Sequence, residues 1–215
     1  MKAKIVSEFL GTAFLVMIVL GSGIMGQNLF PGQVGLALLA NSLATGAGLF
    51  VLIQCLGPIS GAHINPVVSL VEMLWGQIDR KLVVGYILAQ MAGAYLGVIL
   101  THVIFQLPVF QLSEIERLGS HLLLSEVIAT FGLICTIALA GKKHVEFAPM
   151  SVAAYITSAY WFTSSTSFAN PAVTFARNFT NSFGGMAINH YLPFVAAQLL
   201  GAIVAWVVLR AIPQT

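Results

Sequence analysis

Six long apolar runs constrain this sequence more than any other feature. Each is close to the roughly 20 apolar residues that a helix needs to cross the hydrocarbon core of a bilayer. Because so many runs of this length have no place in a water-soluble domain, we expect an all-α membrane protein. The runs lie near residues 5–25, 34–56, 82–105, 121–140, 148–165 and 190–211.

The charge content agrees with a lipid environment. Only 7% of the 215 residues are charged, whereas soluble domains have about 25%. The net charge of +2 is too small to indicate a nucleic-acid partner. Cys55 and Cys135 lie inside apolar runs and have no metal-binding spacing. The sequence therefore argues against a soluble enzyme and predicts no metal and no cofactor.

The basic residues predict the orientation. Cytoplasmic loops of membrane proteins carry an excess of Lys and Arg. If the N-terminus is cytoplasmic, two basic residues, Arg117 and Arg177, fall on the outer side and seven on the inner side. We therefore expect both termini to be cytoplasmic and the protein to lie in a cell membrane, with a bacterial inner membrane as the best fit. The seven inner residues are Lys2, Lys4, Arg80, Lys81, Lys142, Lys143 and Arg210.

The chain also contains an internal repeat. Residues 7–16 (SEFLGTAFLV) match 125–134 (SEVIATFGLI), residues 60–70 (SGAHINPVVSL) match 165–175 (STSFANPAVTF), and 89–100 match 197–208. Each half has three spans, so the second half enters the membrane from the opposite face. We predict a single channel domain over 1–215, made of inverted repeats near 1–105 and 120–215, with its site at the midplane between them.

Two Asn-Pro motifs open apolar stretches that are too short to span. Asn65-Pro66-Val67 and Asn170-Pro171-Ala172 each combine a good N-cap residue with Pro at the first helical position. We predict two re-entrant half-helices of 11–13 residues whose N-termini meet near the bilayer centre. Their dipoles would repel cations there. The two Asn amides would donate hydrogen bonds to water and so hinder proton transfer along the path.

Three polar residues are expected to support the re-entrant loops. Glu8 and Glu126 lie in the first span of each half, where a carboxylate is costly unless it has partners. We expect each to accept hydrogen bonds from loop N–H groups. His63, two residues before Asn65, is expected to hydrogen-bond within its loop.

These motifs resemble the aquaporins, or major intrinsic proteins. The resemblance rests on SGAHINPVVS at 60–69, SFANPAVTFAR at 167–177 and the repeated Glu and Ala-Gln blocks, and it covers nearly the whole chain. It implies six transmembrane helices plus two half-helices, a homotetramer with one pore per subunit, and passive passage of water or small neutral solutes through the lipid bilayer.

The resemblance also implies a constriction near the outer mouth, lined by Thr45, Tyr160, Ser167 and Val173. Ser158 is an alternative to Tyr160. Relatives that pass water or glycerol usually have Arg where this chain has Val173, so a wider filter is expected. The segment SSTSFANPAVTFAR at 164–177 is similar to aquaporins of bacterial arsenic-resistance operons, which implies neutral metalloid acids such as arsenous acid or methylated arsenicals as further solutes.

Two alternatives remain open at this point. Arg177 lies one helical turn after Val173 and could refill the filter of a water-selective channel. Inverted repeats and broken helices are also common in coupled secondary transporters, for which Glu8 and Glu126 would be the ionisable candidates.

Overall fold

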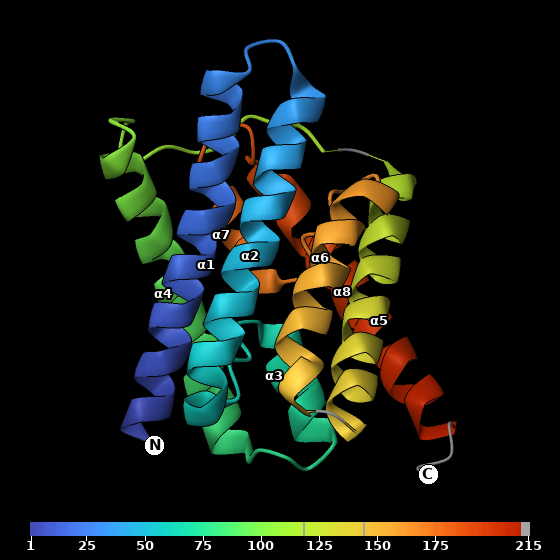
Figure 1. Ribbon diagram of the computed structural model, residues 1–215. Coiled ribbons are helices and arrows are strands. Elements are labelled where there is room, and N and C mark those ends of the chain that lie inside the picture. The colour runs from blue at the N-terminus through green and yellow to red at the C-terminus, as the bar shows by residue number, and fades with distance from the viewer. Residues whose placement is uncertain (118, 144, 212–215) are drawn as a thin grey trace.

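The computed structural model describes residues 1–117, 119–143 and 145–211, and of residues 141–143 and 145 only the backbone. In this part of the chain the structure is all-helical (Figure 1). The long helices are α1 (Lys2–Leu29), α2 (Val34–Ser60), α4 (Arg80–Ile104), α5 (Ser120–Lys143), α6 (Ala148–Phe162) and α8 (Tyr191–Ala211); the short ones are α3 (Pro66–Leu74) and α7 (Pro171–Arg177), with 3-10 turns at Val145–Phe147 and Ile188–His190.

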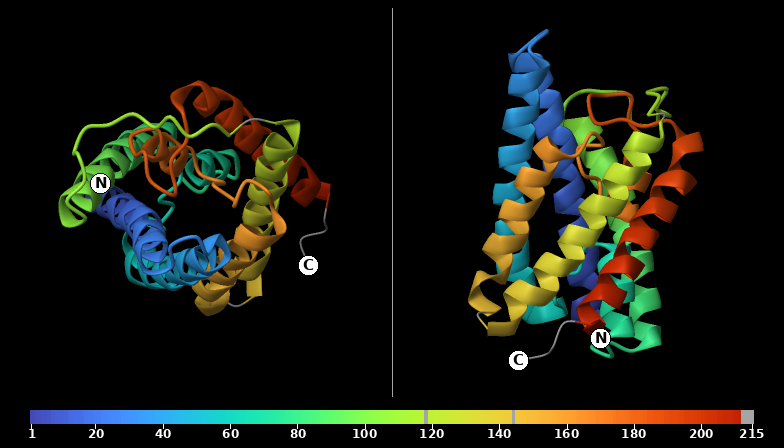
Figure 2. Two further views of the ribbon diagram at one scale, coloured as in Figure 1. Left: turned by 90° about the horizontal axis from the view of Figure 1, so that it is seen from above. Right: turned by 90° about the vertical axis from the view of Figure 1, so that its right-hand side faces the viewer.

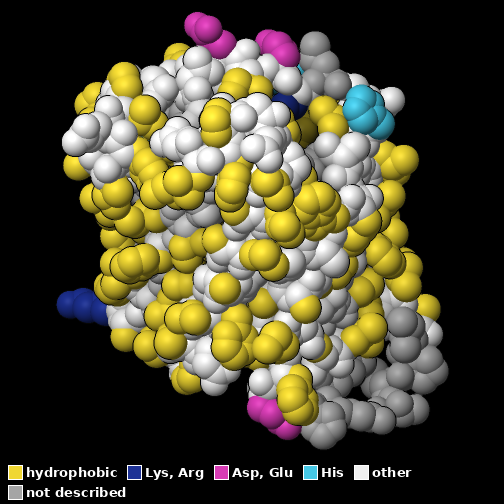
Figure 3. Space-filling model, turned by 45° about the horizontal axis from the view of Figure 1, so that its top comes forward, with side chains coloured by type: hydrophobic (Ala, Val, Ile, Leu, Met, Phe, Trp, Pro, Cys, Tyr) yellow, Lys and Arg dark blue, Asp and Glu magenta, His cyan; other side chains and the backbone are white. Residues whose placement is uncertain are grey.

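The long helices enclose the short ones. Seen from above, they form a ring around α3, α7 and the loops that precede them (Figure 2). Five of the described helices, α1, α2, α4, α5 and α8, are long and apolar enough to cross a membrane. The sixth, α6, has 15 residues and completes the ring. Apolar side chains are spread over the face shown in Figure 3, and charged side chains are sparse there.

The two halves run in opposite directions. Helix α1 rises from the end that carries the N-terminus, whereas α5 starts at the other end and descends (Figure 1). Helix α3 runs from the centre toward the end with the N-terminus, and α7 runs from the centre the other way. The start of α1, the start of α4 and the end of α8 therefore share one end of the bundle. The side chains of Lys142 and Lys143, which contribute to the predicted charge bias, lie outside the described part of the chain.

Glycines bring the helices of each half together. A Cβ atom built on Gly93 of α4 would lie 2.2 Å from the carbonyl oxygen of Phe9 in α1. In the second half, a Cβ on Gly201 of α8 would lie 2.3 Å from the carbonyl oxygen of Val127 in α5. Only Gly permits such a close approach of two helix backbones, as in the small-residue contacts of membrane helices.

The half-helices are shorter than the sequence predicted. Instead of 11–13 residues, α3 has nine and α7 has seven. Helix α3 stops just before Gly76, which has a left-handed φ of 73° and so turns the chain away. Helix α7 stops at Arg177, whose carbonyl oxygen accepts from the N–H of Met186 (2.9 Å) instead of from a following turn of helix; the Asn178 side chain donates to the carbonyl oxygen of Met186, 2.8 Å away.

Candidate functional site

Glu8 organises the first re-entrant loop. Its carboxylate is fully buried and accepts four hydrogen bonds. Oε1 accepts from the Ser60 hydroxyl (2.7 Å) and the His63 N–H (2.9 Å), and Oε2 accepts from the Ile64 N–H (2.6 Å) and the Gln90 side chain (2.8 Å). Four donors offset the cost of removing this group from water.

Glu126 makes the same set of contacts in the second half. Oε1 accepts from the Ser165 hydroxyl (2.6 Å) and the Phe168 N–H (2.9 Å), and Oε2 accepts from the Ala169 N–H (2.9 Å) and the Gln198 side chain (2.6 Å). Every partner is the repeat equivalent of a partner of Glu8. The internal repeat therefore extends to individual hydrogen bonds.

The loops held by these carboxylates are strained. Ala62 and Ile64 have φ values of 47° and 40°, and their repeat equivalents Ser167 and Ala169 have 51° and 46°. Residues other than Gly avoid this left-handed region of φ. Because such strain persists only where the surroundings impose it, we infer that the two buried carboxylates hold both loops in this conformation.

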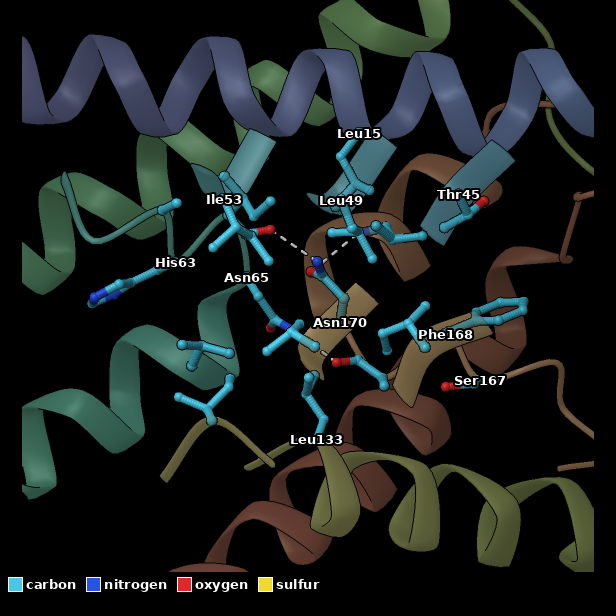
Figure 4. Close-up of a pocket in the computed structure, with 18 of the residues that line it drawn as sticks. Leu15, Thr45, Leu49, Ile53, His63, Asn65, Leu133, Ser167, Phe168 and Asn170 are labelled. Carbon is cyan, nitrogen blue, oxygen red and sulfur yellow. Dashed lines mark hydrogen bonds between the residues drawn. The ribbon is translucent and has the colours of Figure 1, made fainter. Parts of the chain in front are cut away.

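The two Asn-Pro motifs meet at the centre of the molecule. Oδ1 of Asn65 accepts from the Val67 N–H at 3.0 Å, and Oδ1 of Asn170 accepts from the Ala172 N–H at 2.9 Å, so each Asn caps its own half-helix. Each amide nitrogen also donates across to the other loop (Figure 4). An amide has two N–H groups, and among the described residues each Asn nitrogen has one acceptor, which leaves its second N–H available.

A cavity of about 270 Å³ passes these two residues. It is far larger than the roughly 10–15 Å³ that one water molecule needs. One wall is aliphatic, because each of four long helices contributes two residues spaced one turn apart. These pairs are Leu15 and Val19, Leu49 and Ile53, Leu133 and Ile137, and Val152 and Ile156. The other wall is formed mainly by the two loops and their Asn residues, together with residues of α3 and α7.

The residues predicted for the outer constriction share this cavity. Thr45, Tyr160, Ser167 and Val173 all line it, and the hydroxyls of Thr45 and Tyr160 lie 3.2 Å apart. The Ser167 hydroxyl is buried and has no hydrogen-bond partner among the residues that the structure describes. Ser158 does not line the cavity; it is exposed and donates to the carbonyl oxygen of Tyr155.

Arg177 also lines the cavity, although its Cα is one turn beyond Val173. The side chain is 3% exposed. Its Nη1 donates to the carbonyl oxygen of Gly184 (2.8 Å), and its Cζ lies 3.9 Å from the centroid of the Phe168 ring. Tyr160 lies beside the guanidinium. Phe168 was not among the predicted pore residues; its equivalence to His63 in the repeat was the signal that could have indicated it.

The inner end of the cavity carries different groups. His63 and Thr45 lie on opposite sides of the Asn pair (Figure 4). His63 is buried; its Nδ1 lies 3.0 Å from the Ser69 hydroxyl and its ring packs edge-on to Tyr86. Glu72, in the last turn of α3, also lines the cavity. Glu72 was not among the predicted pore residues, because it lies within a largely apolar stretch.

Similarity to known proteins agrees with this geometry. Residues 1–166 match the model of the family described as Major intrinsic protein. The chain is 49% identical to aquaglyceroporin AqpS of Rhizobium meliloti, over 98% of this chain and 90% of that protein. It is 31% identical to aquaporin AqpM of Methanothermobacter marburgensis, over 94% of each. Its fold matches the X-ray structure of the aquaglyceroporin from Plasmodium falciparum, with a TM-score of 0.73, 21% identity, and coverage of 95% and 93% of the two chains.

The fold and the paired half-helices define a membrane channel. The chain belongs to the major intrinsic protein family, and its members are passive channels rather than enzymes. Within the described residues, no group of three His, Cys, Asp or Glu side chains could hold a metal ion.

Proposed function

We propose that this protein is a passive channel for water and small uncharged solutes of the size of glycerol. The observation that carries the proposal is the two-sided cavity. An aliphatic wall faces a wall of loop backbone and two Asn amides, so a solute with both carbon and hydroxyl groups finds a partner on each side. The similarity to proteins called aquaglyceroporin and aquaporin supports the same class of solutes.

Ion exclusion follows from the centre of the pore. The half-helices α3 and α7 direct their positive N-terminal ends at the same point, and the side chains that face the solute there are the neutral amides of Asn65 and Asn170. A cation would lose its hydration there and meet repulsion. A water molecule that accepts from the free N–H groups of both Asn residues has its own hydrogens directed away, which interrupts proton transfer.

The outer constriction sets the solute range in this proposal. Thr45 and Val173 are small beside the aromatic and Arg residues expected in narrower relatives, so the channel admits molecules larger than water. We include neutral metalloid acids, such as arsenous acid and methylated arsenicals, on the sequence resemblance described above.

Arg177 favours a second candidate, a water-selective channel. Its guanidinium lines the same cavity as Val173 and lies beside Tyr160. A long side chain that folds back by one turn would narrow the filter that Val173 leaves open.

Flux in proteoliposomes separates these functions. Water, glycerol and arsenous acid permeabilities would be measured side by side in the wild type and in Arg177→Ala. Glycerol flux in the wild type supports the broad channel, and water flux without any larger solute contradicts it. Glycerol flux that appears only in Arg177→Ala supports the water-selective channel. Passive transport also predicts that solute flux is independent of proton and sodium gradients; dependence on either would indicate the coupled transporter.

We further propose a homotetramer of single-domain subunits, each built from the inverted repeats, in a cell membrane with both termini cytoplasmic. The start of α1, the start of α4 and the end of α8, which carry most of the basic residues, lie at one end of the bundle. Chemical cross-linking in membranes tests the tetramer, and protease access to tags at each terminus tests the orientation.

A further inference from the structure

Two arginines share one aromatic ring at the outer end of the pore. The Cζ of Arg177, on α7, lies 3.9 Å from the centroid of Phe168, and the Cζ of Arg117, in the loop before α5, lies 5.1 Å from the same centroid. Arg177 and Phe168 both line the cavity. Two cationic groups from distant parts of the chain are therefore held next to the path of the solute.

Neither guanidinium has an anionic partner in the described part of the chain. Arg177 donates from Nη1 to the carbonyl oxygen of Gly184, and Arg117 donates from Nε to the carbonyl oxygen of Gly185. The Nε of Arg177 is buried, and no described residue accepts a hydrogen bond from it. By contrast, the buried carboxylate of Glu126 accepts four hydrogen bonds.

The neighbouring carboxylates are engaged elsewhere. Glu126 interacts electrostatically with both arginines, but its two oxygens accept from the loop and from Gln198. The carboxylate of Glu116 lies 2.5 Å from His190. Glu114 is exposed. The neighbouring carboxylates therefore leave both guanidiniums without an anionic partner, and the hydrogen bonds of Arg177 go to neutral groups, the carbonyl oxygen of Gly184 and the side chain of Tyr160.

The arginines also repel each other. Burial, together with the positive charge of Arg177, lowers the pKa of Arg117 to about 10. An anion bound to both groups would remove this repulsion and give the buried Nε of Arg177 its missing acceptor. Guanidiniums favour oxyanions, because two N–H groups match two oxygens.

We propose that the outer mouth of the pore is a binding site for a small organic oxyanion of the carboxylate or sulfonate class, held by Arg117 and Arg177. The unpartnered hydroxyl of Ser167, which also lines the cavity, provides a further donor. Because the bound anion would sit beside the constriction at Thr45 and Tyr160, it obstructs the flow of water. Only this last consequence depends on the proposed function.

Thermal unfolding of the purified protein in detergent tests binding without any flux measurement. The probe is potassium methanesulfonate, which stays ionised at neutral pH, compared with potassium chloride at equal ionic strength. We expect a saturable rise in Tm with methanesulfonate but not with chloride, because a ligand stabilises the folded state that binds it. Arg117→Gln and Arg177→Gln should each weaken the apparent affinity by about tenfold or more.

Arg210→Gln is the matched control. Arg210 also stacks over an aromatic ring, that of Trp206 at 4.7 Å, but it lies near the end of α8, at the opposite end of the bundle. This variant should bind as the wild type does. If Arg177→Gln fails to fold, Arg117→Gln still tests the site. Equal stabilisation by chloride, or unchanged affinity in Arg117→Gln, would overturn the proposal.

Water flux in proteoliposomes then tests the consequence. Methanesulfonate should reduce water permeability in the wild type and leave Arg117→Gln unaffected. If the protein binds methanesulfonate but conducts no water under any condition, the oxyanion site stands and the proposed channel function is wrong. If water flows and neither Tm nor flux responds to methanesulfonate, the oxyanion site is wrong and the channel stands.

Discussion

The side-chain amide of Asn65 donates a hydrogen bond to the carbonyl oxygen of Ala169, 2.8 Å away in the other half of the chain. The reciprocal bond runs from Asn170 to the carbonyl oxygen of Ile64 at 2.9 Å. These two bonds join the re-entrant loops at the centre of the pore. Each Asn therefore has three tasks: it caps a helix, ties the opposite loop and keeps one N–H for the solute.

The reciprocal bonds predict coupling between the two motifs. Asn65→Ala and Asn170→Ala should each destabilise the protein by about 1–3 kcal/mol, because each removes a helix cap and leaves a carbonyl oxygen unpaired. The double variant should lose less than the sum, with a coupling energy of about 0.5 kcal/mol or more. Unfolding of the single and double variants in SDS titrations measures this. Strictly additive losses would mean that the loops are held independently.

Much of the architecture was accessible from the sequence for physical reasons. The six apolar runs predict the six long helices. The Asn-Pro motifs predict where α3 and α7 begin, since Asn65 and Asn170 are strong N-caps. The predicted end of α7 was wrong because it depends on a contact with a later loop, in which the Met186 N–H donates to the carbonyl oxygen of Arg177. The predicted end of α3 was wrong because the left-handed turn at Gly76 was not used as a stop signal.

The candidate site divides in the same way. Partners for Glu8 and Glu126 could be expected because a carboxylate in an apolar span requires donors. The position of Arg177 could not be read from its spacing, since a long side chain reaches a full turn from its Cα and its direction depends on Gly184 and Phe168. Arg117 approaches the same ring from another part of the chain, and no local pattern marks it.

The matching hydrogen bonds of the two buried carboxylates predict equal effects of substitution. Glu8→Gln and Glu126→Gln each replace a charged carboxylate by a neutral amide. The amide NH₂ then faces groups that are themselves hydrogen-bond donors, so at least one bond is lost. We expect each to lower the free energy of unfolding by about 3 kcal/mol. SDS titration measures the loss, and the exposed Glu114→Gln serves as a control that should change it by less than about 0.5 kcal/mol. A large difference between Glu8→Gln and Glu126→Gln would show that the two loops depend differently on their carboxylates.

The constriction proposed at Val173 predicts a change of selectivity. Val173→Arg adds a long cationic side chain to the cavity wall, next to Thr45, Tyr160 and Ser167. Glycerol, which fills more of the opening than water does, should slow by about tenfold more than water, which corresponds to a difference of about 1.4 kcal/mol in barrier height. Stopped-flow light scattering gives both rates. Val173→Leu, which changes the volume without the charge, is the control. An unchanged ratio of glycerol to water flux would place the constriction elsewhere.

In each half, two helices pack closely because a glycine of one lies against the backbone of the other. Gly93→Ala would place a Cβ 2.2 Å from the carbonyl oxygen of Phe9, and Gly201→Ala one 2.3 Å from that of Val127. A backbone atom cannot rotate away, so α4 must move from α1, or α8 from α5, and we expect a loss of about 3 kcal/mol in each variant. Gly57→Ala in α2 is the matched control, since a Cβ there has no atom within 4 Å; it should stabilise the helix by about 0.4–1 kcal/mol. SDS titration compares the three variants, and a stable Gly93→Ala protein would show that the α1–α4 contact can open without cost.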